Sequence, residues 1–221
     1  AAGIPVVIFD SDLDGDAHTS FVATNNKLGG QMGADHLVEL LGDRKGKVMV
    51  MRFIQGTAST EARAAGCLQS VQAAGLEVVA DPFAEDATVA GCKKTAANTL
   101  EGFVGGGKLQ LDAVFACNDR ATLGMLAALE DLRKSGVEMD VKFVGFDFTP
   151  RLVESLQQGK LDALVVQNPR KMGYLAVTTL VEHLRDQPVE PLIDTGVELA
   201  TAERLQSDEA IRELVGLNPE P

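Results

Sequence analysis

The chain has 221 residues, of which 45% are hydrophobic and 24% charged, as is ordinary for a globular protein. Its formal net charge of −12 argues against a nucleic-acid-binding surface, which needs clustered lysine and arginine to displace counterions from phosphate. No apolar stretch is long enough to span a bilayer, and no signal peptide is visible at the start, as would also hold for a mature exported protein after cleavage.

Short apolar runs rich in Val, Ile and Phe alternate with segments of helical periodicity along the chain. The predicted strands lie, in chain order, at 4–9, 20–24, 47–53, 76–80, 113–117, 141–146 and 163–166. The predicted helices lie at 28–41, 60–74, 88–104, 120–135, 150–158 and 169–185. Strands that alternate with helices form parallel sheets buried on both faces. We therefore predict an α/β fold with a doubly wound parallel sheet.

Five β-α units run from the strand at 47–53 to the strand at 163–166 and make one complete doubly wound domain. The pieces before and after them supply short strands and a helix that cannot bury their apolar faces alone. The predicted division is 1–24 and 168–194 for the remnant of an N-terminal lobe, 25–167 and 195–207 for a C-terminal α/β lobe, and 208–221 for a polar tail.

Four of the apolar runs end in an acid or an amide. The residues at these ends are Asp10, Asn118 with Asp119, Asp147, and Gln167 with Asn168. Ligands of open α/β sheets bind outside the carboxyl ends of the strands, so these side chains are expected to line one cleft. Carboxylate and amide groups there favour a small, neutral, polyhydroxylated ligand.

Helix capping separates structural from free polar groups at these strand ends. Thr149 can cap the helix that starts at Pro150, which leaves Asp147 without a structural role. Asp119 is better placed than Asn118 to cap the helix from 120, so Asn118 is the expected ligand group. The predicted caps are Asp119, Thr149 and Asn168, and the predicted free groups are Asn118, Asp147 and Gln167.

Arg63 lies in the first turn of a predicted helix, where the helix dipole disfavours a cation. It is either a solvated surface residue or a donor of paired hydrogen bonds to neighbouring hydroxyls. Enzyme signatures are sparse: the three histidines form no HExxH pair, no GxSxG elbow is present, and the glycine run 105–107 follows a helix and predicts a flexible turn. We expect no enzyme and no cofactor.

No metal site is expected either. The loop 10–16 resembles the start of an EF-hand, but Phe21 occupies the twelfth position where calcium needs a glutamate. The three cysteines have no CxxC spacing, and Cys117 lies within an apolar run as a small buried hydrophobe. Cys67 and Cys92 both fall in predicted helices, and the sequence leaves open whether they pair.

Six segments together resemble the periplasmic sugar-binding proteins of ABC transporters, in the ribose-binding-like group with the type I periplasmic-binding fold. They are GIPVVIFDSD, TNNKLGGQMGADHL, EARAAG, AVFACNDRATLGMLAAL, KFVGFDFTPRLVESLQQGKLDALVVQNPRKMGYLAV and IDTGVELAT. The resemblance runs from about residue 3 to about residue 201, and it implies a chain that lacks most of the N-terminal lobe.

What the resemblance implies is a two-lobed receptor that closes on a monosaccharide or related polyol. The hinge would lie near Thr24-Asn25, Gln167-Asn168 and Asp194-Thr195. The implied ligand-binding residues are Asp10, Ser11, Arg63, Asn118, Asp147 and Gln167. The implied partners are the sugar, an ABC transporter permease or membrane sensor, and the N-terminal lobe as a separate fragment, with no nucleic acid. The implied location is periplasmic or extracellular.

The chain also departs from the group. Ser11 stands where ribose binders often carry an arginine, which puts ribose specificity in doubt. Aromatic residues that stack on a sugar are expected to be missing, since the chain has no Trp and only Tyr174, and the position near Asp86, commonly aromatic, is acidic. The alternative function is the effector-binding domain of a LacI-type transcription repressor, which shares the fold, and a sugar-processing enzyme is a third.

Overall fold

The computed structural model describes residues 3–217, and most of them are arranged around a six-stranded sheet. The strand order is β11 (Val197–Thr201), β9 (Ala163–Gln167), β8 (Lys142–Phe146), β7 (Ala113–Ala116), β3 (Lys47–Met51) and β4 (Glu77–Ala80). Neighbouring strands are parallel except β11, which is antiparallel to β9. The predicted α/β fold is therefore confirmed. The order reverses between β3 and β7, and such a switch point is where doubly wound sheets bind ligands.

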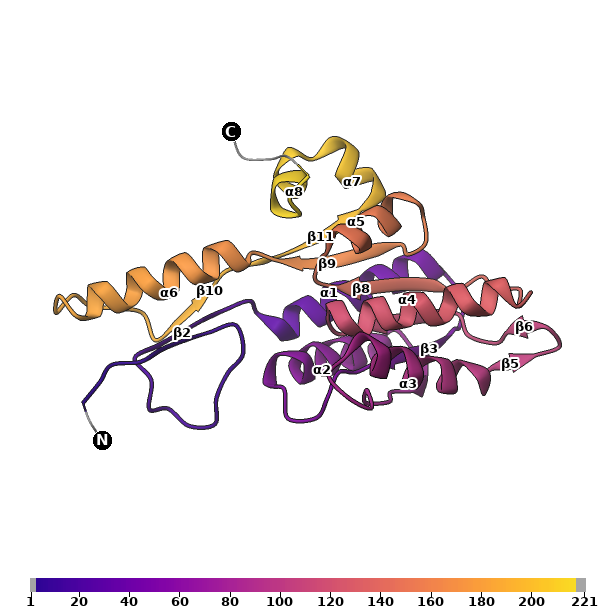
Figure 1. The fold of residues 1–221 in the computed structure, drawn as a ribbon, viewed down its shortest axis with the longest axis horizontal. Helices are drawn as coiled ribbons and strands as arrows, with labels where there is room; N and C mark the ends of the chain where they lie inside the picture. The colour runs from indigo at the N-terminus through magenta and orange to yellow at the C-terminus, as the bar shows by residue number, and fades with distance from the viewer. Residues whose placement is uncertain (1–2, 218–221) are drawn as a thin grey trace.

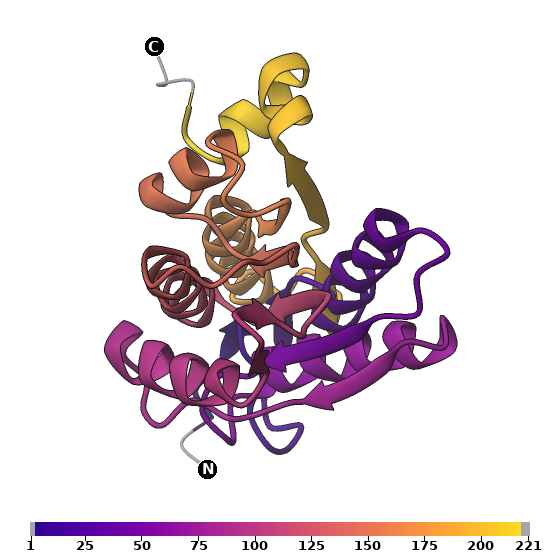
Figure 2. The same ribbon diagram turned by 90° about the vertical axis from the view of Figure 1, so that its right-hand side faces the viewer.

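Helices cover both faces of this sheet (Figure 2). On one face lie α1 (Asn26–Leu41) and α2 (Ala58–Ala73), and on the other lie α3 (Val89–Glu101), α4 (Asp119–Lys134) and α5 (Pro150–Gln157). Each face has its own hydrophobic core: the first core lies under α1 and α2, and the second under α3, α4 and α5. In strand β3, Val48 and Val50 belong to the first core and Met49 and Met51 to the second, so the strand is apolar on both faces.

Glycines bring α1 and α2 into close contact on the first face. A Cβ atom added at Gly30 of α1 would collide with the backbone oxygen of Arg63, and one added at Gly66 of α2 would collide with that of Lys27. The close packing is the reason that glycine is needed at both positions. Backbone conformation is not the reason, since neither glycine has a positive φ. This approach holds α2, and with it Arg63, against the edge of the sheet.

A second, smaller sheet lies beside the first (Figure 1). It consists of β1 (Val7–Phe9), β2 (Ser20–Ala23) and β10 (Leu192–Asp194), all parallel, with β2 in the centre. Helix α6 (Pro169–His183) packs on β1 and β2. These strands and α6 come from the segments predicted to be the remnant of a lobe.

Three chain crossings join the two sheets, and those that follow β2 and β10 contact each other. The Thr195 amide donates to the Ala23 carbonyl oxygen at 2.9 Å, and the Asn25 amide donates to Asp194 Oδ1 at 3.1 Å. The hydroxyl oxygens of Thr24 and Thr195 lie 3.4 Å apart. The crossings coincide with the positions where a hinge is predicted.

The predicted C-terminal end of the helix at 88–104 is wrong. The helix expected at 88–104 ends at Glu101, and the glycine run belongs to a hairpin of β5 (Val104–Gly105) and β6 (Lys108–Leu109). Gly106 and Gly107 both have positive φ, as the tight two-residue turn of such a hairpin requires.

The segment 208–217 is not a polar tail. It contains α8 (Glu209–Leu214), which follows α7 (Ala202–Ser207), and its Ile211 and Val215 are buried in the second core. Apolar residues four apart place one face of α8 inward. The rest of the predicted tail, 218–221, lies outside the described residues.

The three cysteines are free and buried. Cys67 and Cys92 belong to cores on opposite faces of the large sheet, so they do not form a disulfide. Burial raises the pKa of the Cys117 thiol to about 12 and that of the Cys92 thiol to about 11. Among the helices of residues 3–217, none has the length and apolar character to cross a membrane.

Candidate functional site

Two aspartates at strand ends adopt left-handed backbone conformations. Asp147 follows β8 with φ 67°, and Asp10 follows β1 with φ 73°. This region is unfavourable for residues other than glycine, and such strain collects at functional sites. Asp147 belongs to the large sheet and Asp10 to the small one, so the two carboxyl groups approach the space between the sheets from different sides.

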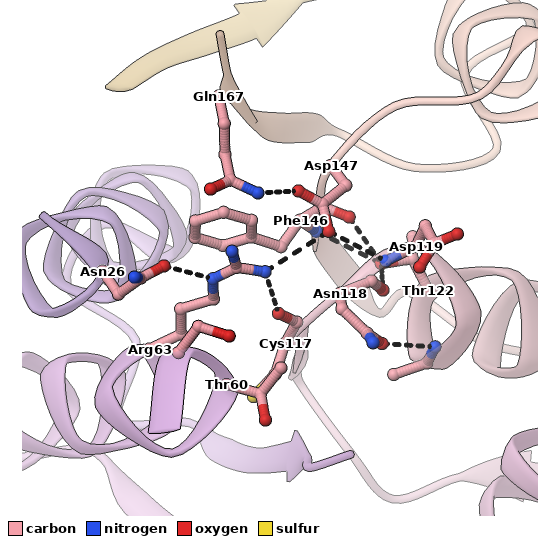
Figure 3. Close-up of polar contacts among 12 residues, drawn as sticks. Asn26, Thr60, Arg63, Cys117, Asn118, Asp119, Thr122, Phe146, Asp147 and Gln167 are labelled. Carbon is pink, nitrogen blue, oxygen red and sulfur yellow. Dashed lines mark hydrogen bonds and ion pairs between the residues drawn. The ribbon is translucent and has the colours of Figure 1, made fainter. Parts of the chain in front are cut away.

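Arg63 is buried beneath this space, with only 2% of its surface exposed. Its Nε donates to Asn26 Oδ1 at 2.8 Å and its Nη1 donates to the Cys117 carbonyl oxygen at 3.0 Å. The guanidinium also stacks on the Phe146 ring, 3.8 Å from the centroid (Figure 3). The surface-residue interpretation of Arg63 is therefore wrong. These hydrogen bonds engage Nε and Nη1, and Figure 3 draws no dashed line from the third guanidinium nitrogen, Nη2, to the other residues shown.

Asp147 accepts hydrogen bonds on both carboxylate oxygens. Oδ2 accepts from Arg63 Nη1 and from the Asp119 amide, each at 3.3 Å, and Oδ1 accepts from Gln167 Nε2. Asp147 caps no helix, as predicted, but three donors hold its carboxylate, so the prediction that it has no structural role is wrong. Gln167 Oε1 is buried and accepts no hydrogen bond from the described residues. A buried acceptor of this kind is costly unless a ligand or water supplies a donor.

The helix cap at this strand end is Asn118, and not Asp119 as predicted. Asn118 is the N-cap of α4, because its Oδ1 accepts from the Ala121 amide at 2.9 Å, while Asp119 occupies the first helical position. The extended backbone of Asn118 suits a cap, and an acid in the first turn suits the helix dipole. The amide nitrogen of Asn118 remains available to a ligand. The caps predicted at Thr149 and Asn168 are confirmed.

All six predicted ligand residues line one cavity of about 540 Å³ between the two sheets. The lining consists of Phe9, Asp10, Ser11, Phe53, Thr57, Ser59, Thr60, Arg63, Asn118, Asp119, Arg120, Asp147, Phe148, Gln167, Pro169 and Met172. The structure thus brings the six together, and their contact with a ligand remains a prediction. Ser11 also makes a hydrogen bond, since its Oγ accepts from the Ser59 amide at 3.3 Å.

Sequence reasoning missed the aromatic part of this lining. Phe9, Phe53 and Phe148 supply it, whereas Tyr174 projects from α6 and is 70% exposed. The expectation of missing aromatic residues considered only Trp and Tyr. A signal was present, because Phe9 immediately precedes Asp10 and Phe148 immediately follows Asp147. Asp86 is not part of the lining and instead accepts from Thr88 at the start of α3.

The cavity combines carboxylate acceptors, amide groups, one buried guanidinium and phenyl rings. Each hydroxyl of a polyol donates one hydrogen bond and accepts others, so this mixture suits a neutral ligand with many hydroxyl groups and an apolar C–H face. Within residues 3–217, no three His, Cys, Asp or Glu side chains gather in a way that could hold a metal ion.

Comparison with known proteins gives consistent matches. The family described as periplasmic binding protein domain matches residues 1–188. The ribose import binding protein RbsB of Escherichia coli (strain K12) is 32% identical over 189 residues, which cover 86% of this chain and 60% of that protein. The RbsB protein of Bacillus subtilis (strain 168) is 30% identical over 201 residues, covering 91% and 62%. The chain therefore spans about three fifths of the length of these relatives.

Solved structures resemble this one over nearly the whole chain. A carbohydrate transporter solute binding protein from Agrobacterium radiobacter, in complex with D-arabinose, superimposes with a TM-score of 0.86 at 30% identity, covering 96% of this chain and 70% of that one. A solute binding protein from Bacillus halodurans C-125 with bound myo-inositol gives a TM-score of 0.81 at 30% identity, covering 95% and 70%.

Proposed function

The chain belongs to the periplasmic binding protein family, and on that premise we propose that it captures a neutral monosaccharide or related polyol for an ABC sugar importer. The observation that carries the proposal is the cavity in which Asp147 already accepts hydrogen bonds from both Arg63 and Gln167. The relatives quoted above are named as binding or transport proteins, which favours a receptor over the effector domain of a repressor or a sugar-processing enzyme.

In the proposed complex each polar group has a distinct role. Asp10 and Asp147 accept from sugar hydroxyls, and Arg63 donates through Nη2, because its other nitrogens are engaged. Asn118 donates through its amide nitrogen, since its oxygen caps α4. Gln167 Oε1, the buried acceptor without a partner, accepts from another hydroxyl. An epimer that leaves one of these groups unpaired would bind more weakly.

Phe9, Phe53 and Phe148 would cover the apolar C–H face of the sugar. Phe9 ends β1 of the small sheet, whereas Phe53 and Phe148 follow β3 and β8 of the large sheet, so stacking would use both sides of the cavity. Closure of the two sides on the sugar would exclude water and strengthen the charged hydrogen bonds. We therefore propose that the two sheets belong to two lobes, divided as predicted from the sequence up to residue 207, and that the ligand favours the closed arrangement.

The exposed face of α6 marks where the small sheet would be completed. Tyr174, Val177, Val181 and Leu184 are between 38% and 70% exposed, and their spacing of three, four and three residues places them on one side of the helix. We propose that a further segment, in the same polypeptide or a separate one, covers this face as the rest of an N-terminal lobe. The permease or membrane sensor would then recognise the closed receptor in a periplasmic or extracellular compartment.

Isothermal titration calorimetry of the complete protein tests the proposed function. The panel is D-ribose, D-arabinose, D-allose, D-fucose, D-tagatose and myo-inositol, with a sugar acid and a nucleoside as members of other ligand classes. We expect saturable one-to-one binding of at least one neutral member. The 221-residue chain by itself is expected to bind the same sugar weakly, because α6 and the small sheet would remain uncovered. Absence of binding by the complete protein to every neutral member would refute the proposal.

The pH dependence of sugar affinity should report on Asp10. Partial desolvation raises the pKa of its carboxyl group above 3.8, Asp147 adds to the rise and Arg63 opposes it. Protonation removes the negative charge and turns one acceptor oxygen into a donor, so affinity is expected to fall with falling pH, beginning at a higher pH than an ordinary aspartate would give. Asp10→Asn should flatten this part of the profile, as measured by calorimetry at several pH values.

The same shift sets the expected effect of Asp10→Asn on stability. A raised folded-state pKa means that the native state binds the proton more tightly, so the charged group opposes folding at neutral pH and this opposition is relieved as the pH falls through the shifted value. Asp10→Asn should therefore leave the unfolding temperature at pH 7 unchanged or higher.

For the affinity prediction, the contradicting result is a pH profile of sugar affinity for Asp10→Asn that is identical to that of the parent protein. That result would contradict the role given to Asp10.

A further inference from the structure

A hydrogen bond across the cavity joins the small sheet to α2. Ser11, in the loop after β1, accepts on its Oγ from the backbone amide of Ser59, which lies 48 residues further along the chain in the first turn of α2. Ser59 itself is buried. This contact therefore links a loop of one sheet to a helix packed on the other.

The N-terminus of α2 lacks the cap that the other helices have. Its N-cap residue, Thr57, has an extended backbone, as a cap should, but its side chain makes no capping hydrogen bond. The other helices between residues 3 and 217 are capped by the side chain of their own N-cap residue. The amide of the second helical position, here Ser59, is one that such a side chain ordinarily satisfies. Ser11 fills this place from the opposite side of the cavity.

We infer that Ser11 is a positioning residue that caps α2 across the cavity and thereby sets Asp10 opposite Arg63, in place of touching the sugar itself. Asp10 is the neighbour of Ser11, and Arg63 lies one helical turn after Ser59. One hydrogen bond thus fixes the relative placement of two proposed ligand groups that stand on different sheets. The inference rests on the proposed function for its effect on affinity, but the contact itself concerns only this chain.

The residue type fits this role. A serine hydroxyl is short and has acceptor lone pairs, both of which a helix N-terminus requires. An arginine has five donors and no acceptor, so it could reach a sugar but could not accept from the Ser59 amide. A serine at this position can therefore make the contact between the two sides, and an arginine could not.

Two substitutions in the complete protein test the effect on binding. Ser11→Ala removes the acceptor and should weaken the affinity for the bound sugar by about two- to thirtyfold, the range expected for loss of a helix cap. Ser11→Thr keeps the hydroxyl and should restore most of the affinity. Ser207→Ala is the matched control, since its exposed hydroxyl bonds only the Glu203 carbonyl within α7, and it should bind like the parent protein. Parental affinity of Ser11→Ala would overturn the inference.

A distance measurement without ligand separates positioning from direct contact. Spin labels at Arg185→Cys and Gln72→Cys, both exposed, report the placement of the small sheet relative to α2. The native cysteines are buried and should not be labelled. Ser11→Ala should broaden the distance distribution in the unliganded protein, and Ser11→Thr should not. Weaker binding with an unchanged distribution would mean that Ser11 touches the sugar, which would also overturn the inference. If no sugar binds even the parent protein, the proposed function fails while this measurement still tests the contact.

Discussion

Asp147→Ala is expected to reduce sugar affinity at least about a hundredfold. The substitution removes the acceptor proposed for the sugar and the carboxylate that Arg63 faces at 3.3 Å, and it frees Gln167 to turn away. A hydrogen bond to a charged group contributes about 1.5–3 kcal/mol, and a buried cation left without its partner costs more, so a change of at least about 3 kcal/mol follows. Calorimetry with the tightest-binding sugar measures the loss.

The matched control for this prediction is Asp140→Ala. Asp140 is also an aspartate in an ion pair, but its partners, Arg44 and Lys142, lie away from the cavity and its side chain is 73% exposed. Such surface pairs contribute little, so the control should bind like the parent protein. An Asp147→Ala protein that folds normally and retains affinity within threefold of the parent would remove Asp147 from the site.

Gly30→Ala is expected to destabilise the fold by about 3 kcal/mol, the upper end of the usual cost of overpacking. The added methyl group would collide with the backbone oxygen of Arg63, which cannot move without displacing α2 from α1. Because Arg63 moves with α2, sugar affinity should fall as well. Urea unfolding followed by circular dichroism gives the free energy of unfolding.

Gly173→Ala is the control for the effect of alanine in a helix. Gly173 lies within α6, and a Cβ atom added there meets nothing within 4 Å. Alanine has the higher helix propensity by about 1 kcal/mol, so this variant should be as stable as the parent protein or slightly more stable. Equal stability of the Gly30→Ala and parent proteins would contradict the close packing of α1 on α2.

The sequence was sufficient for the architecture because its signals are local. Apolar runs of strand length, helical spacing and capping residues such as Thr149 and Asn168 act within a few residues, and the structure confirms them. The error at Asn118 and Asp119 has a different origin. Both residues are good caps, and the choice between them depends on where β7 ends, which is set by its pairing in the sheet.

The site was predicted less completely because its contacts join distant segments. The burial of Arg63 follows from its stacking on Phe146 and its bonds to Asn26 and Cys117, none of which is a neighbour in the sequence. The bond from Ser59 to Ser11 spans two sheets and has no local signature. The Phe residues beside the strand-end aspartates were a local signal for the aromatic lining of the cavity.

A crystal structure of the complete protein with its tightest-binding sugar tests the central claim most directly. We predict the sugar between the two sheets, with hydroxyl groups within hydrogen-bond distance of Asp147, of Arg63 Nη2 and of Gln167 Oε1. A second cavity of about 500 Å³, lined by residues that include Lys171, Arg204 and Ile211, provides the contrasting location. Sugar bound there, or bound without contact to Asp147 and Arg63, would contradict the account.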